Sequence, residues 1–182
     1  MKKIIMSWSK CRVEVGKTGA DDAMATTLYS VGTINDKSTT LATADGGKLE
    51  AKATGGITVA SEEYEPVVTI TTRVKEIDFD TEGLFTGATK SSDGSELDVK
   101  TLIVSDEFSV KVTPKNIGAT GIKAPRCSVS FRPGSSEEEG HYVDLTFTIL
   151  PTESGTLYKK FKVATSDWGT ETMYTGTTNA GS

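Results

Sequence analysis

The sequence predicts an all-β protein, a sandwich or barrel of many short strands with one or two short helices. Three observations lead to this prediction. Thr and Ser together supply roughly a quarter of the residues, and β-branched side chains fit pleated strands better than helices. Apolar and polar residues alternate with a period of two in several short runs. Clusters of Gly, Asn, Asp and Pro separate these runs, as turns between strands do.

Each alternating run places a row of apolar side chains on one face of a strand, and we expect these rows to form a shared core. The runs lie at 10–15, 68–75, 108–113, 127–132, 143–149 and 160–163. The predicted core consists of Val13, Val15, Ile70, Val110, Val112, Val129, Phe131, Val143, Leu145, Phe147, Ile149, Phe161 and Val163.

The chain of 182 residues fits one domain, which we place at 1–174. Residues 175–182 hold only Thr, Gly, Asn, Ala and Ser, so we expect a flexible tail. A short helix is predicted through residues 83–85, with Asp80 or Thr81 as its N-terminal cap and Gly87 ending it. A second, weaker candidate helix runs from Asp21 to Tyr29.

Charge and hydropathy indicate a protein that neither grips nucleic acid nor enters a membrane. The net charge of −5 argues against a cationic DNA-binding face. No apolar run reaches the roughly 20 residues that cross a bilayer. The first residues carry too few apolar side chains for a signal peptide, so we expect the protein to stay in a cytoplasm. In that compartment Cys11 and Cys127 are expected to be small buried thiols without a disulfide.

The inventory of reactive residues predicts no enzyme, no cofactor and no metal. His141 stands alone, and zinc needs several Cys or His at fixed spacing. The run 15–18, Val-Gly-Lys-Thr, lacks the earlier glycine of a phosphate-binding loop, because that position is Cys11. Acid clusters at 62–65, 78–82 and 137–139 could bind calcium or hydrolyse glycosides, but solvated loops explain them better, and 137–139 is predicted to be a hairpin tip.

Residues 28–87 contain a succession of motifs that is more specific than the alternating strands. Residues 28–34, Leu-Tyr-Ser-Val-Gly-Thr-Ile, lead through 36–40, Asp-Lys-Ser-Thr-Thr, into a glycine-rich segment, a strand at 66–75 and the capped segment 77–87. This order resembles the tube-forming (major tail) proteins of long-tailed bacteriophages and related contractile injection systems, best over residues 28–87. The predicted helix is shorter than in that family.

The resemblance implies a β-sandwich or half-barrel subunit with an extended hairpin. It implies six copies in a ring, rings stacked into a hollow tube, and DNA that passes through the lumen without specific binding. It also implies other tail proteins as partners, such as a tape measure, a terminator or a sheath, and a location in the virion tail after assembly in the host bacterial cytoplasm.

In that family setting, residues 36–65 are expected to be the assembly hairpin, mobile in a free subunit and ordered by a neighbouring ring. The candidate assembly residues are Lys48, Leu49, Glu50, Ala51, Lys52, Ile57 and Val59. Lys48, Glu50 and Lys52 put both signs of charge on one strand face, so the face that lines the lumen stays open. The simpler alternative is that 36–65 is only a polar meander.

Two other classes of protein share the Thr-rich strands. A surface adhesin or pilin-like sandwich would need an export signal, which we do not find. A carbohydrate-binding module would need exposed aromatic residues on one face, whereas Trp8, Trp168 and Tyr174 lie at the two ends of the chain. The host, the tail type and the oligomeric state of the isolated subunit stay open.

Overall fold

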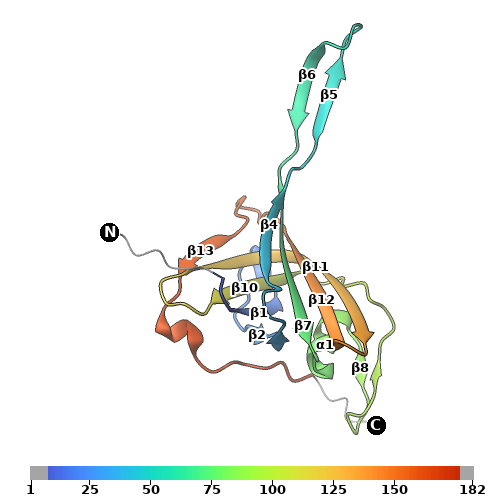
Figure 1. Ribbon diagram of the computed structural model, residues 1–182, viewed down its shortest axis with the longest axis vertical. Helices are drawn as coiled ribbons and strands as arrows, with labels where there is room; N and C mark the ends of the chain where they lie inside the picture. The colour runs from blue at the N-terminus through green and yellow to red at the C-terminus, as the bar shows by residue number, and fades with distance from the viewer. Residues whose placement is uncertain (1–7, 177–182) are drawn as a thin grey trace.

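A computed structural model describes residues 8–176. The main element is one curled antiparallel sheet, a half-barrel (Figure 1), so the fold is all-β as the sequence predicts. In spatial order its strands are β2 (Tyr29–Ser30), β1 (Cys11–Lys17), β10 (Phe108–Pro114), β11 (Thr120–Ser136), β12 (Gly140–Ile149), β7 (Val67–Lys75) and β3 (Thr33–Ile34). Outside this path, β13 (Lys159–Lys162) pairs with β11 and β4 (Thr40–Ala44) pairs with β7. Two hairpins form separate sheets: β5 (Lys48–Lys52) with β6 (Thr58–Glu63), and β8 (Thr89–Lys90) with β9 (Leu97–Asp98).

The long strand β11 makes the sheet curl. Residues 122–127 of β11 pair with β10, Thr120–Lys123 pair with β13, and Cys127–Ser136 pair with β12, so Cys127 is the partner of both Phe108 in β10 and Ile149 in β12. The register with β10 shifts between Phe108 and Val110, and a bulge of this kind bends a strand and increases its twist. The acidic stretch 137–139 is the tip of the β11–β12 hairpin, as predicted.

The concave side of the half-barrel holds the core. Of the thirteen predicted core residues, all but Phe161 are buried. The helix α1 (Phe79–Thr86) closes this side, and the ring of Phe85 packs against the rings of Phe108, Phe131 and Phe147 at centroid distances of 5.2, 5.8 and 6.5 Å. The helix forms at the predicted place but begins earlier, because its N-cap is Asp78 and the predicted caps, Asp80 and Thr81, lie inside it. Asp78 caps the N-terminus by accepting from the backbone N–H of Thr81, and Gly87 ends the helix in the left-handed region at φ 67°.

Phe161 departs from the prediction because it is only half-buried. It pairs with Gly121, and its ring covers that glycine on the face of the sheet that also carries Lys123. Strand β13 ends at Lys162. The buried Val163 therefore lies just after the strand and not within it, so the alternation predicted for 160–163 is not continued to this residue.

The helix predicted from Asp21 to Tyr29 is wrong. Only a 3₁₀ turn, η1 (Ala20–Asp22), is present, and Asp21 has left-handed backbone angles of φ 55° and ψ 39°. Tertiary contacts override the weak helical signal. The carboxylate of Asp22 accepts from the backbone N–H of Glu153 at 3.0 Å and lies 3.5 Å from Arg126.

The chain ends with a segment that crosses the convex face of the sheet. It contains a second 3₁₀ turn, η2 (Thr165–Trp168), which is tied to β10 by an ion pair of 2.9 Å between Asp167 and Lys111. Of the predicted flexible tail, residues 177–182 lie outside the part of the chain that the structure describes. Within 8–176, no helix is both long and apolar enough to cross a membrane.

Candidate assembly interface

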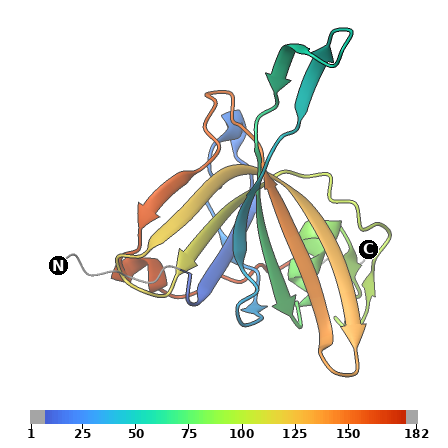
Figure 2. The ribbon, with the colours of Figure 1, turned by 45° about the horizontal axis from the view of Figure 1, so that its top comes forward.

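A two-stranded hairpin projects far beyond the half-barrel (Figures 1 and 2). It occupies residues 45–66, between the end of β4 and the start of β7, and we call it the arm. Every residue of β5 and β6 is exposed. The preceding strand, β4, pairs with β7 from Thr40 to Ala44 and so belongs to the main sheet rather than to the arm.

All seven candidate assembly residues lie on the arm. Five of them, from Lys48 to Lys52, form β5, while Ile57 follows the turn and Val59 is in β6. The turn is closed by a backbone hydrogen bond of 2.8 Å from Ala53 N to Ile57 O. The structure therefore brings these residues together on one projecting element, and their role in assembly stays a prediction.

The two faces of the arm differ in chemistry. On one face, the ammonium groups of Lys48 and Lys52 lie 3.1 and 3.5 Å from the carboxylate of Glu50, so the mixed charges expected there neutralise one another. On the opposite face, Leu49 stands across from Glu62, and Ala51 stands across from Ala60. Leu49, Ile57 and Val59 are 57%, 68% and 64% exposed, which leaves large apolar side chains in water on an element without its own core.

The root of the arm depends on a glycine. A Cβ atom at Gly46 would collide with the backbone oxygens of Tyr64 and Glu65. The two segments at the root of the arm can therefore approach closely only because this residue has no side chain. The backbone N–H of Tyr64 donates to the carbonyl of Gly47 at 3.1 Å, just beyond this close approach. The close approach fixes the direction in which the arm leaves the sheet.

A second surface lies on β13, at the flank of the half-barrel (Figure 1), and the sequence reasoning missed it. Strand β13 presents Lys159, Lys160 and Lys162, and Lys123 of β11 stands directly opposite Lys159. We call these four residues the lysine edge. In the sequence this surface corresponds to the run Lys-Lys-Phe-Lys at 159–162, which by itself indicates only an alternating strand.

The other candidate groups of the sequence have structural roles in the described residues. Asp78 caps α1, Asp80 binds Lys90 at 2.8 Å, and Glu139 binds Arg73 at 2.8 Å. The exposed ring of His141 shares a hydrogen bond of 2.9 Å with Ser135 Oγ. Within residues 8–176, no group of three or more His, Cys, Asp or Glu side chains is arranged to hold a metal ion.

Glu82, the last acid of the 78–82 cluster, is buried on α1, and burial raises the pKa of its carboxyl group. Its position on a helix, not in a solvated loop, corrects the expectation for this cluster.

The thiols and the indoles are also held in structural positions. Both cysteines are free, with Cys127 buried and Cys11 half-buried, and burial raises the pKa values of the two thiols to about 12 and about 11. Thiols with such pKa values are poor nucleophiles at neutral pH. The indole N–H of Trp8 donates to the carbonyl of Thr120, and that of Trp168 donates to the carbonyl of Pro114. Both rings are half-buried, and although they come from the two ends of the chain they line the same pocket.

Neither a family model nor a curated protein matches the chain. The case for a function therefore rests on the arm, the sheet and the charges described above.

Proposed function

We propose that the chain is the structural subunit of a phage-type tail tube. Copies associate into hexameric rings, the rings stack, and the stack encloses a channel for DNA. The proposal joins the sequence resemblance over residues 28–87 to the half-barrel with its projecting hairpin.

The arm is the observation that carries the proposal. A lone two-stranded hairpin is marginally stable in water, and this one exposes every residue of both strands. Its exposed Leu49, Ile57 and Val59 would be covered if the arm packed against a neighbouring copy. The conformation is therefore better suited to an assembly than to an isolated subunit.

The half-barrel also supports assembly because it is an open sheet. Open sheets have edge strands whose backbone groups can pair with another chain, whereas a closed barrel has no edges. A sheet that continues from one copy to the next around a ring would satisfy these groups. The acidic chain, with a net charge of −5, suits a channel that DNA crosses without binding.

Electron microscopy of the purified full-length chain tests the proposal. We expect rings with sixfold symmetry and longer tubes as the protein concentration rises, together with large species in light scattering. A strictly monomeric protein at high concentration, in several salts, would contradict the proposal.

A further inference from the structure

Two four-residue segments of this chain have the same order of side chains with opposite charge. The root of the arm reads Glu62-Glu63-Tyr64-Glu65, and strand β13 reads Lys159-Lys160-Phe161-Lys162. In each segment two charged residues are followed by an aromatic residue and a third charge. We call the first segment the acidic segment.

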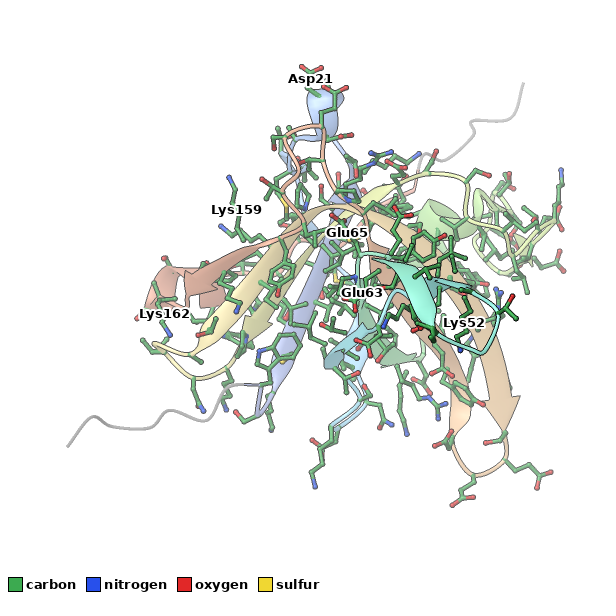
Figure 3. The ribbon with its side chains drawn as sticks, turned by 90° about the horizontal axis from the view of Figure 1, so that it is seen from above. Asp21, Lys52, Glu63, Glu65, Lys159 and Lys162 are labelled. Carbon is green, nitrogen blue, oxygen red and sulfur yellow. The ribbon has the colours of Figure 1, made fainter. Side chains whose placement is uncertain are left out.

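The two segments lie apart in one copy. Seen from above, Glu63 and Glu65 lie on the arm over the middle of the molecule, whereas Lys159 and Lys162 lie to the left, on β13 (Figure 3). The side view also places the arm above the sheet and β13 on its flank (Figure 1). A pairing of the two segments therefore takes place between copies.

Within the described residues the lysine edge has no close counter-ion: Asp167 binds Lys111 at 2.9 Å and acts on Lys123 only at longer range. In the described part of the chain, none of its four lysines forms an ion pair. Lys162 donates to the hydroxyl of Thr120 at 2.8 Å, and Lys123 lies 4.9 Å from the ring centroid of Phe161. Like charges directly opposite one another, as Lys123 and Lys159 are, destabilise a sheet. An acidic partner strand would remove that penalty.

The acidic segment carries the charges that complement the lysine edge. Glu62, Glu63 and Glu65 form no ion pair within residues 8–176, because Lys48, which stands across from Glu63, binds Glu50 instead. Tyr64 is 55% exposed. Over residues 45–66 the arm carries two lysines and five acids, Asp45, Glu50, Glu62, Glu63 and Glu65, so its net charge is 2 − 5 = −3.

The edges of the strands allow the two segments to pair. In residues 8–176, β13 pairs with β11 on one side and with no strand on the other, and β6, which contains Glu62 and Glu63 and is followed by Tyr64 and Glu65, pairs only with β5. An exposed edge strand rich in lysine repels a second copy of itself, but the same charges attract an acidic strand. The lysine edge thus selects its partner by charge.

We propose that β13 of one copy binds the acidic segment of a second copy by strand addition. The inference rests on the proposed self-assembly, since it names the surface that receives a neighbour's arm. Three carboxylate–ammonium pairs and one aromatic pair form when the segments run parallel: Glu62 with Lys159, Glu63 with Lys160, Tyr64 with Phe161, and Glu65 with Lys162. The contact joins two different surfaces, so it repeats from copy to copy and generates a closed ring or an open filament.

Charge reversal in the full-length chain tests the contact. One triple variant carries Lys159→Glu, Lys160→Glu and Lys162→Glu, and the other carries Glu62→Lys, Glu63→Lys and Glu65→Lys. We expect each variant alone to need at least about tenfold more protein than the wild type to self-associate. An equimolar mixture of the two variants should associate like the wild type, because every contact in an alternating assembly again joins opposite charges.

The matched control is a third variant, with Lys37→Glu, Lys100→Glu and Lys115→Glu. It changes the net charge as much as the β13 variant does, at exposed lysines outside both segments. We expect it to associate like the wild type. Circular dichroism and thermal melts verify that all variants fold.

Cysteine cross-linking tests whether the acidic segment and β13 run parallel or antiparallel. A Glu62→Cys chain is mixed with a Lys159→Cys chain, or with a Lys162→Cys chain, and oxidised with a copper–phenanthroline catalyst. The parallel alignment predicts efficient cross-linking with Lys159→Cys. Preferred cross-linking with Lys162→Cys, or no cross-link above the wild-type background, overturns it.

The outcomes separate this inference from the proposed function. If the wild type associates and the β13 variant associates equally well, or if the mixture of variants stays dissociated, the lysine edge is not the docking surface and the tube proposal stands. If the wild type never associates, both are overturned.

Discussion

At the scale of single residues, the structure separates side chains that hold the fold from side chains that are left exposed on its surface. Phe147 is fully buried and contacts Phe85 of the helix, so it joins the sheet to the helix that closes it. Ile103 is the opposite case, since it is 76% exposed.

We predict that Phe147→Ala lowers the free energy of unfolding by about 3–5 kcal/mol, because the deletion leaves a cavity that the surrounding side chains fill only partly. Urea denaturation of the full-length chain measures the change. Ile103→Ala is the control and should change the stability by less than about 0.5 kcal/mol. A loss below about 1 kcal/mol for Phe147→Ala would mean that this face of β12 is not the core face.

Asp93 provides a pH-dependent prediction at the same scale. The hydroxyl of Ser91 donates to its carboxylate at 2.6 Å, and the N–H and hydroxyl of Ser95 donate as well, so the pKa of Asp93 falls to about 2. A lowered pKa means that these hydrogen bonds stabilise the turn above the ordinary pKa and are lost as the pH falls through about 2. NMR titration of the Asp93 carboxyl carbon should show this low value. In Ser91→Ala the pKa should rise toward its ordinary value, and an unchanged pKa there would contradict the assignment.

At the scale of elements, the arm is separable from the half-barrel. Tyr64 N and Gly47 O are already joined by a hydrogen bond of 3.1 Å, so residues 48–63 can be replaced by a short turn without moving β4 or β7. An Asn-Gly pair is suited to this place, because it favours the two-residue turn of a β-hairpin.

We predict that replacing residues 48–63 with Asn-Gly abolishes the stacking of rings and leaves the stability of the half-barrel within about 1 kcal/mol of the wild type. Light scattering and electron microscopy measure assembly, and urea denaturation measures stability. A matched replacement at the tip of the β11–β12 hairpin, residues 137–139 by Asn-Gly, should leave assembly intact. Normal tubes from the chain without its arm would exclude the arm as the assembly element.

The strands and the helix also show which parts of the fold the sequence could predict. Alternating strands such as 143–149 were predictable, because a single buried face leaves a local pattern, and the end of α1 was predictable from Gly87, whereas its cap was placed at Asp80 or Thr81 instead of Asp78. The half-buried position of Phe161 was not, because it depends on the register of β13 against β11. The lysine edge was missed for the same reason, since Lys123 and Lys159 become neighbours only through that register.

At the scale of the whole molecule, the charges are distributed unevenly. The arm has a net charge of −3, while β13, with three exposed lysines, and the half-buried Lys123 form a cationic edge at the flank of the half-barrel. An acidic arm and a basic edge on the same chain attract one another between copies, and this gives self-association a defined direction.

Hydrogen exchange of the free and the assembled chain tests this distribution in one experiment. In the free chain, amides of the arm should exchange fast, because β5 and β6 contact no other strand in the described residues, while amides of β4 should be protected by their pairing with β7. On assembly, we expect strong added protection in residues 45–66 and in β13, and little change in the buried strands β10 and β12. Both segments must gain protection together, since each supplies the hydrogen-bond partners of the other. Protection that rises in the arm and not in β13 would mean that the arm packs on another surface of the neighbour, and equal exchange of the arm in both states would mean that the arm takes no part in assembly.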